Sequence, residues 1–378
     1  MATPDEVLLA AADDIGIDQV GDLPVERAEI TREFMEAALS EAFPGVRLDG
    51  VTVDDAHHGF STVWRVHLDA DEAQYAAGLP RRVMLKGQFE AATRARKKNT
   101  TNVSLWMEYH GYQFLPELGL NIPRVFFKAL QQKRQQVCIV MEDLTLRGAR
   151  LCRGLSPNSP EQVRRRLTAL ADLHARTWGG AEVEDGGRYG GLPINGARIM
   201  DDFLDDAGYH REGWYEYAAL PRGQACPVRF QDYDWARRAM QYAARLSDSL
   251  PQCVIHGDTH LGNCYEDADG APGFFDSLLR REPGISEACY HIVNALDPID
   301  RRAHDRDLIA HYRAELAARG VAVPPLAEMM EQYAGFIIVN FVTFIVNEAF
   351  YHSEAFNTAH AVRAAVAMMD HDVWGMVG

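Results

Sequence analysis

The feature that most constrains this chain is a polar run that directly follows an apolar one. Val254 and Ile255 read as the end of a buried strand, and the polar residues His256 to Asn263 come next. Such a run forms a loop that is held on the edge of a rigid element. An apolar Phe-Phe pair ahead of Asp276 predicts another short strand. The pattern therefore predicts a second carboxylate at the end of that strand.

These side chains have the chemistry that phosphoryl transfer requires. Asp258 can accept the proton of an attacking hydroxyl group, so we predict that it is the catalytic base. Asn263 and Asp276 carry hard oxygen ligands of the kind that Mg²⁺ prefers. We therefore predict that Asn263 and Asp276 bind a metal ion.

Two other interpretations of the same residues are open. A His-Gly-Asp cluster also forms ordinary turns, in which Asp caps its own backbone and Gly supplies a positive φ. A metallophosphatase is the second alternative, because Asp172 and His174 upstream resemble pieces of its metal-ligand runs. Apolar residues from Val163 to Trp178 recur at helical spacing together with His174. This spacing indicates a packed core histidine and argues against a metal ligand.

Composition limits the possible partners. A chain of 378 residues with 47% hydrophobic residues is expected to form two domains or lobes. Its formal net charge of −16 argues against a nucleic-acid or anionic-membrane surface, because both partners require clustered Lys and Arg. The apolar stretch Phe336 to Val346 is too short to span a bilayer and predicts a buried helix.

The expected compartment is the cytoplasm. The six cysteines show neither a CxxC pair nor zinc spacing, so reduced thiols are expected. The acidic residues Asp5, Glu6, Asp13 and Asp14 give the first 20 residues the wrong charge for a signal peptide.

The run H-G-D-x-H-x-x-N, followed by Asp276, resembles the catalytic loop of the aminoglycoside phosphotransferase and choline kinase group, which are relatives of protein kinases. The resemblance implies an α+β, two-lobed, protein-kinase-like fold. A small N-terminal lobe with an antiparallel sheet is expected at residues 1–145, and a larger, mainly helical C-terminal lobe at residues 146–378. ATP, Mg²⁺ and a small-molecule alcohol acceptor are the implied cofactors and partner. The same resemblance implies that Asp258 is the base and that Asn263 and Asp276 bind the metal.

The N-terminal part has the element order of a kinase nucleotide-binding lobe. Predicted strands at residues 51–53 and 62–68 flank a turn that contains Gly59, Phe60 and Ser61, and the strand at residues 82–85 ends in Lys86. By resemblance, the turn covers the nucleotide phosphates and Lys86 binds them. Glu108 lies in a helical stretch and resembles the carboxylate that pairs with this lysine.

The segment from Val137 to Leu144 resembles the hinge between the two lobes. In the group, backbone atoms of the hinge bind adenine, so we predict backbone contacts from Met141 and Leu144. The side chains of Glu142 and Asp143 need not touch the nucleotide.

Acceptor residues are harder to predict. The residues Asn340, Thr343 and Asn347, continued by Tyr351, form a polar stripe on an otherwise apolar helix expected from Gly335 to Tyr351. This stripe either bonds to neighbouring backbone or lines the acceptor pocket. The acidic segment around Asp205 is the other candidate, since acidic segments hold cationic sugars in aminoglycoside kinases.

We therefore expect an ATP- and Mg²⁺-dependent phosphotransferase that acts on a hydroxyl group of a small molecule, as a monomer or homodimer. The alternative is a nucleotide-binding pseudokinase with a regulatory or structural role. The presence of Lys86, Asp258, Asn263 and Asp276 together argues against this alternative. Two departures from the family pattern affect the expected rate and loop geometry: Ser277 follows Asp276 where an aromatic residue is frequent, and Glu287 replaces an Asp.

Overall fold

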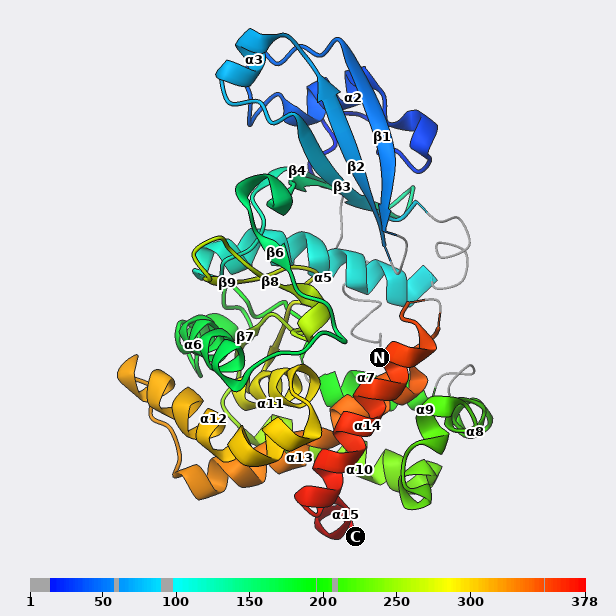
Figure 1. Cartoon of the computed structure of the whole chain (residues 1–378), viewed down its shortest axis with the longest axis vertical. Helices are drawn as coiled ribbons and strands as arrows, with labels where there is room; N and C mark the ends of the chain where they lie inside the picture. The colour runs from blue at the N-terminus through cyan, green and yellow to red at the C-terminus, as the bar shows by residue number, and fades with distance from the viewer. Residues whose placement is uncertain (1–13, 58–60, 90–97, 195, 206–209, 350) are drawn as a thin grey trace. The chain divides into compact units, whose positions relative to one another are not determined.

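The structure is a computed structural model that describes residues 14–57, 61–89, 98–194, 196–205, 210–349 and 351–378. The chain divides into two compact units (Figure 1). The first unit contains residues 1–114 and 122–150, and the second contains residues 115–121 and 151–378. The short segment 115–121 belongs to the second unit because Asn121 is bonded there, through its backbone carbonyl to Phe274 and through its side chain to Asp267.

The first unit is built on a five-stranded antiparallel sheet in the order β1-β2-β3-β5-β4. The strands are β1 (Gly50–His57), β2 (Thr62–Asp69), β3 (Arg82–Gly87), β4 (Val125–Gln131) and β5 (Gln136–Glu142). Burial alternates along β2, so one face of this strand packs on the core. Both faces of β5 are buried, which fits its continuous apolar sequence.

Helices complete the first unit. They are η1 (Arg27–Glu29), α2 (Arg32–Leu39), α3 (Glu72–Ala76), η2 (Leu144–Arg147) and α5 (Lys98–Glu117), which continues into the second unit. Phe34 of α2 packs edge-on against Phe127 of β4, with ring centroids 6.3 Å apart. This contact places the apolar face of α2 on the sheet and closes the core on one side.

The second unit is mainly helical. Its helices are α6 (Pro160–Ala175), η3 (Ala181–Val183), α7 (Gly196–Asp205), α8 (Arg211–Ala218), α9 (Pro221–Gln224), η4 (Val228–Gln231), α10 (Tyr233–Ser249), η5 (Leu261–Asn263), α11 (Gly284–Ala295), α12 (Pro298–Ala318), α13 (Leu326–Val346), α14 (Glu354–Asp370) and α15 (Val373–Val377). Helix α13 packs against α10, α11 and α14 in the centre of the core (Figure 1). An apolar helix in this position explains why most of its surface is buried.

Short strands carry the loops of the second unit. Strand β7 (Cys253–Ile255) pairs with β10 (Arg280–Glu282), and β6 (Arg150–Leu151), β8 (Cys264–Glu266) and β9 (Pro272–Phe274) form a three-stranded sheet. The strands expected at Val254-Ile255 and ahead of Asp276 are confirmed. The expected α+β class, with an antiparallel sheet in the N-terminal unit and a mainly helical second unit, is also confirmed.

The helix expected from Gly335 to Tyr351 has different bounds. Helix α13 begins at Leu326 and ends at Val346, and Asn347 has an extended ψ of 124°. The apolar stretch is part of a longer helix than expected, because α13 has 21 residues and is long and apolar enough to cross a membrane by length and composition alone. Its expected burial is confirmed, because 78% of its most apolar window lies inside the protein.

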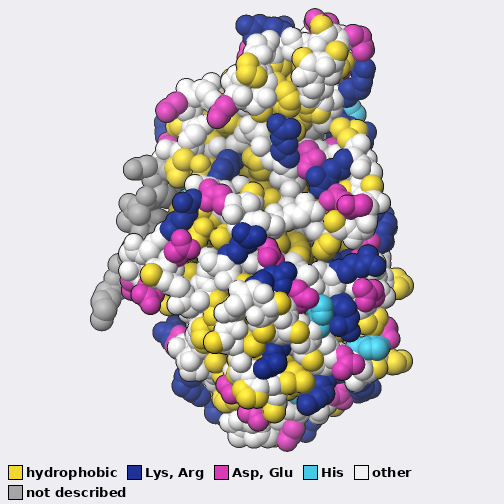
Figure 2. Space-filling view, turned by 90° about the vertical axis from the view of Figure 1, so that its left-hand side faces the viewer, with side chains coloured by type: hydrophobic (Ala, Val, Ile, Leu, Met, Phe, Trp, Pro, Cys, Tyr) yellow, Lys and Arg dark blue, Asp and Glu magenta, His cyan; other side chains and the backbone are white. Residues whose placement is uncertain are grey.

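Charges of both signs lie on the face of the protein that Figure 2 shows. On this face, Lys and Arg side chains are interspersed with Asp and Glu side chains.

Candidate active site

One buried carboxylate supports the loop between β7 and β8. Glu287 of α11 accepts hydrogen bonds from the backbone N–H groups of His256 at 3.1 Å and Gly257 at 2.5 Å. Its Oε2 atom also lies 2.9 Å from Nε2 of His174. Burial raises the pKa of Glu287, but the hydrogen bond and charge of His174 and the loop groups outweigh burial, so its pKa lies below the usual value. The loop is therefore bound to an ionised side chain in the core.

Gly257 is required by the shape of this loop. Its φ is +88°, and a Cβ atom there would lie 2.0 Å from the carbonyl oxygen of Leu278. The Gly257 carbonyl accepts a hydrogen bond from Nη1 of Arg280 at 2.7 Å. This bond ties the loop to strand β10.

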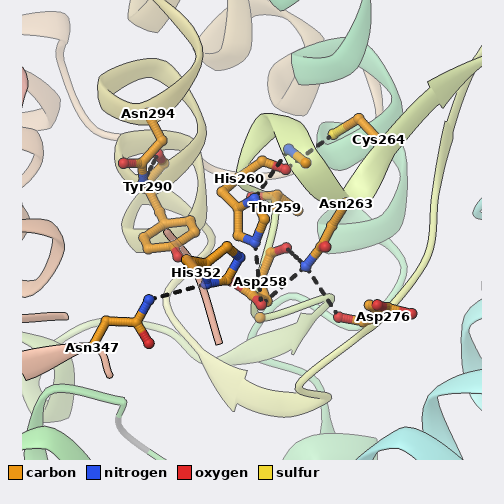
Figure 3. Close-up of polar contacts among 12 residues, drawn as sticks. Asp258, Thr259, His260, Asn263, Cys264, Asp276, Tyr290, Asn294, Asn347 and His352 are labelled. Carbon is orange, nitrogen blue, oxygen red and sulfur yellow. Dashed lines mark hydrogen bonds and ion pairs between the residues drawn. The ribbon is translucent and has the colours of Figure 1, made fainter. Parts of the chain in front are cut away.

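The carboxylate of Asp258 is held from two sides (Figure 3). The hydroxyl of Tyr290 donates to its Oδ1 atom at 2.9 Å, and Nδ2 of Asn263 donates to its Oδ2 atom at 3.0 Å. The side chain of Asp258 is still 23% exposed. Burial and the charge of Asp258 raise the pKa of Tyr290 well above its usual value, so Tyr290 stays a hydroxyl donor. Asp258 is thus fixed in one position and can be reached by a ligand.

Asn263 joins the two loops that the sequence predicted to be close. Besides Asp258, its Nδ2 atom contacts the carbonyl oxygen of Asp276 at 3.5 Å (Figure 3). The N–H groups of Asn263 point at these oxygens, which leaves its Oδ1 atom as the ligand that it can offer to a cation. Asp276 follows the end of β9 and has a φ of 58°, in the left-handed region. Its backbone is therefore strained, as is frequent for residues of functional sites.

This donor set fits Mg²⁺. One amide oxygen and one carboxylate lie on adjacent loops, and Mg²⁺ commonly takes one or two carboxylates together with water and substrate phosphate oxygens. Asn263 and Asp276 are the residues that would hold the ion. When bound, it would neutralise charge on the nucleotide phosphates.

A buried histidine supports the next residue of the loop. Nδ1 of His291 lies 2.7 Å from the carbonyl oxygen of Thr259, and because a carbonyl only accepts, Nδ1–H donates. Burial, with a smaller effect of Arg166, lowers the pKa of His291 to about 3. The ring is therefore neutral across the physiological range.

The interpretation of His174 as a core histidine is confirmed. His174 is fully buried, and its Nδ1 atom lies 2.7 Å from the hydroxyl of Tyr312. Asp172, the other residue of the possible metal-ligand run, forms ion pairs with Arg176 and Arg319. Both residues are therefore engaged in interactions other than metal binding, as the helical spacing suggested.

The first unit contains the predicted lysine and its predicted partner. Nζ of Lys86 on β3 lies 2.5 Å from Oε1 of Glu108 on α5, and the two side chains are 3% and 7% exposed. A lysine that is buried to this degree needs a paired charge. Glu108 therefore fixes the position of the Lys86 ammonium group within this unit.

The structure describes only some of the other residues that were predicted to bind the nucleotide. Gly59 and Phe60 lie outside the described residues, while Ser61 is described and buried. Met141 lies on β5 and Leu144 begins η2, and both side chains are buried, so any contact of theirs with a nucleotide would involve backbone atoms. Asp143 forms ion pairs with Arg82 and Arg65, which gives its side chain a structural role.

The predicted acceptor stripe divides into separate environments. Asn340 is buried and its Oδ1 atom accepts from Asn294 at 2.7 Å, whereas the Thr343 hydroxyl donates to the backbone of Val339 at 2.7 Å. Asn347 lies beyond the end of α13, so the expected single helical stripe is wrong. The Nδ2 atom of Asn347 contacts Nδ1 of His352 at 3.0 Å and Oδ1 of Asn357 at 2.8 Å.

The acidic segment is paired within the unit. Asp205 is 63% exposed on its side chain, and it forms an ion pair with Arg237, which also binds Asp201 at 2.6 Å. Arg237 lies on α10 and both carboxylates lie on α7. This pairing joins the two helices.

A recess lies beside the loop, at β10, α11 and α13. Its lining includes Arg280, Glu282, Ser286, Tyr290, Phe336 and Asn340. Because Tyr290 also contacts Asp258, the recess adjoins the candidate base. Of the predicted stripe, Asn340 is therefore the residue that reaches this recess.

Sequence reasoning missed Tyr290 as a partner of Asp258. A signal was present, because Glu287, Tyr290, His291 and Asn294 form a polar stripe at positions i, i+3, i+4 and i+7 of an otherwise apolar helix. The stripe faces the loop, since Glu287, Tyr290 and His291 each bond to it.

A family model described as the phosphotransferase enzyme family matches residues 56–276. The match covers more than half of the chain and includes both the Lys86 strand and the loop that ends at Asp276. The chain belongs to this family. It is accordingly a small-molecule kinase that acts on hydroxyl groups, as the resemblance implied.

One solved structure with a TM-score of 0.50 shares the fold of this family member, and two others are similar at lower scores. The GDP complex of wild-type aminoglycoside 2'-phosphotransferase-IIIa has 11% identity and a TM-score of 0.50, and the alignment covers 90% of this chain and 99% of that chain. Choline kinase LicA from Streptococcus pneumoniae has 11% identity and a TM-score of 0.47, with 88% and 98% covered. Aminoglycoside phosphotransferase APH(3'')-Id from Streptomyces rimosus ATCC10970 has 16% identity and a TM-score of 0.44, with 76% and 92% covered. No curated protein matches the chain significantly.

Proposed function

We propose that this protein transfers the γ-phosphoryl group of ATP, with Mg²⁺, to a hydroxyl group of a small molecule, and that Asp258 is the base. The observation that carries the proposal is the position of Asp258, which is fixed by Tyr290 and Asn263 and is still partly exposed. A base must be held within hydrogen-bonding reach of the proton that it accepts. Asp258 meets this requirement for an acceptor that binds beside it.

The proposed reaction forms one bond, breaks one bond and transfers one proton. The acceptor oxygen forms a bond to the γ-phosphorus, the bond from that phosphorus to the leaving oxygen of ADP breaks, and the acceptor proton moves to a carboxylate oxygen of Asp258. Asn263 and Asp276 would hold the metal ion at the phosphates. Tyr290 and Asn263 orient the carboxylate throughout.

Lys86 has the second proposed role. A buried lysine that is paired with Glu108 at 2.5 Å is held as a fixed positive charge, which suits the binding of nucleotide phosphates. We include Ser61, Gly59 and Phe60 as the proposed cover over the phosphates, and Met141 and Leu144 as proposed backbone contacts to the base. Lys86, Asp258, Asn263 and Asp276 are all present in the sequence, which favours an active enzyme over a pseudokinase.

The experiment is an assay of nucleoside diphosphate release with a panel of alcohols, in the presence and absence of Mg²⁺. The donor is varied between ATP and GTP, because the solved relative noted above is a GDP complex. The proposal expects release that depends on both an alcohol and Mg²⁺. Release that is independent of alcohols, or the absence of release with every alcohol and both donors, would contradict it.

A further inference from the structure

We propose that His352 is an acceptor-binding residue, and that its imidazole ring donates a hydrogen bond from Nε2 to an oxygen of the acceptor. The inference rests on the proposed function, because it concerns the group that binds beside Asp258. His352 belongs neither to the H-G-D-x-H-x-x-N loop nor to the predicted polar stripe, so the sequence alone does not indicate this role.

His352 lies near Asp258, on the side opposite to the proposed metal ligands. The His260 ring connects the two, because its Nε2 atom lies 3.8 Å from Oδ2 of Asp258 and its centroid lies 5.3 Å from that of His352. In Figure 3, Asp258 lies between His352 on one side and the proposed metal ligands on the other. In phosphoryl transfer the attacking and leaving oxygens are roughly in line, on opposite sides of the γ-phosphorus. The acceptor therefore reaches Asp258 from the side of His352.

The position of the His352 ring is fixed by its neighbours. The ring stacks on that of Phe356, with centroids 4.2 Å apart and planes 18° apart. Arg222, which is fully buried, binds the chain before and after His352: its Nη1 atom donates to the carbonyl oxygen of Asn347, and its Nε atom donates to Oε2 of Glu354 at 3.1 Å. A side chain that is already ordered loses little conformational entropy when a ligand binds.

The amide of Asn347 determines which nitrogen of His352 carries the proton. Nδ2 of Asn357 donates to the backbone carbonyls of Asn347 at 3.3 Å and His352 at 3.2 Å, so the Oδ1 atom of Asn357 is an acceptor. The Asn347 atom that lies 2.8 Å from this Oδ1 is therefore Nδ2. The same Nδ2 atom donates its second N–H to Nδ1 of His352 at 3.0 Å. In the neutral ring the proton is consequently on Nε2.

A donor at Nε2 has a direct use in this reaction. The oxygen atoms of an alcohol have lone pairs that accept hydrogen bonds. A bond from Nε2 of His352 to one of them fixes the acceptor in one orientation, with its reacting hydroxyl group directed at Asp258. Holding two reacting groups in the correct geometry is a major source of rate enhancement.

Two substitutions of His352 distinguish the roles of its two nitrogens. In His352→Asn the side-chain amide takes the place of Nδ1, so the contact with Asn347 is kept and the donor at Nε2 is lost. In His352→Gln the longer side chain brings its amide to the place of Nε2, so a donor is kept there and the contact with Asn347 is lost. Acceptor binding should therefore be impaired in the first variant, and the stability of the fold in the second.

Steady-state kinetics test the role in acceptor binding. The panel consists of choline, glycerol, kanamycin and streptomycin, and the probe is the alcohol with the highest kcat/KM for the wild-type protein with Mg²⁺ and its better donor, ATP or GTP. His352→Asn should raise KM for this probe by about threefold to tenfold, because one neutral hydrogen bond is lost, and leave KM for the nucleotide unchanged. His352→Gln should keep KM for the probe within about twofold of the wild-type value.

Three results would overturn the inference: an unchanged KM for the probe in His352→Asn, an equal rise in both variants, or an equal rise in KM for the nucleotide. In each of these cases the wild-type protein still phosphorylates an alcohol, so the proposed function stands and only the role of His352 fails. If no alcohol of the panel is phosphorylated with either donor, the proposed function fails, and the inference fails with it.

His371→Asn is the matched control. His371 follows the C-terminal end of α14, about 25 Å along this helix from His352. Its ring also lies against an aromatic residue, Tyr333, with centroids 5.3 Å apart, and its Nε2 atom lies 2.8 Å from Oδ2 of Asp305. This substitution should leave both KM values unchanged, whatever its effect on stability. A rise in KM for the probe equal to that of His352→Asn would contradict the assignment, because the effect would then come from folding.

The position of the proton is tested without any acceptor. In ¹⁵N NMR spectra of the protein, the imidazole signals of His352 are those that are absent from His352→Asn. They should show a proton on Nε2 and none on Nδ1, because Nδ1 accepts from Asn347. A proton on Nδ1 would contradict the inference.

Discussion

The substitution Glu287→Gln tests how the catalytic loop is held. In the wild-type protein Glu287 accepts three hydrogen bonds, from the N–H groups of His256 and Gly257 and from His174. Glutamine has nearly the same shape but only one acceptor oxygen. Whichever way the amide turns, it presents an NH₂ group to at least one buried donor.

The expected loss of stability follows from these bonds. One buried donor without a partner costs about 1–3 kcal/mol, and the bonds that remain lose the contribution of the negative charge. The neutral amide is easier to bury than a carboxylate, which offsets part of this loss. We therefore expect Glu287→Gln to lower the free energy of unfolding by about 2–4 kcal/mol. Because Asp258 directly follows the loop N–H groups, kcat should fall as well.

Urea unfolding of both proteins measures this difference, with Glu331→Gln as the control because Glu331 is exposed on α13. The control should change stability by no more than about 0.5 kcal/mol. The pKa of Glu287 is depressed in the folded protein, so its stabilisation is present above the unfolded value of 4.5 and is lost as pH falls through the lower folded value. The difference in the free energy of unfolding between the wild type and Glu287→Gln should therefore become smaller below about pH 4.5. The reasoning would be refuted if Glu287→Gln lost no more stability than the control, or if its difference from the wild type in the free energy of unfolding became larger in acid.

Three further predictions concern the metal, the pH response and the end of α13. Asp276→Ala should weaken binding of Mg²⁺-ATP about tenfold or more and leave metal-free adenosine binding unchanged in calorimetry, and an equal loss for both ligands would make Asp276 a structural residue. The pKa of His291 is about 3, so the unfolded chain binds a proton below about pH 6.5 that the folded protein does not, and stability should fall by about 2 kcal/mol between pH 7.5 and pH 5 through this group. His291→Gln should reduce this acid slope, whereas the exposed control His210→Gln should keep it, and equal slopes would contradict the assignment. Asn347→Leu should lower the free energy of unfolding by about 1–3 kcal/mol because it removes a bond to Asn357, and a raised acceptor KM without lost stability would place it in the pocket instead.

The loop could be predicted from the sequence because its signals are local. An apolar strand followed by a polar run fixed the place of Asp258 and Asn263, and the second Phe-Phe strand fixed Asp276. The contact of Asn263 with both loops then follows from two strand ends that lie close in space. The pairing of Lys86 with Glu108 was predicted from resemblance and is present in the first unit.

The parts that sequence reasoning missed depend on residues far apart in the chain. Helix α13 ends at Val346, and the carbonyl of Asn347 is bound by Arg222, more than 100 residues earlier. This bond cannot be predicted from the residues near Asn347 in the sequence. The spacing of the polar residues therefore suggested a helix that continued beyond Val346. Glu287 seemed to put the loop geometry in doubt, but its longer side chain reaches both N–H groups and His174.

The central claim, that Asp258 is the base of an alcohol kinase, is tested most directly by Asp258→Asn. The assay measures transfer of labelled phosphate from ATP to an accepted alcohol, with Mg²⁺-ATP affinity measured by calorimetry on the same protein. Asparagine keeps the shape of the side chain, and its amide oxygen can still accept the hydrogen bond from Tyr290. The carboxylate that would take the proton is lost. The account predicts a fall in kcat of about 10²–10⁴ with nucleotide affinity nearly unchanged. Near-normal transfer by this variant would contradict it.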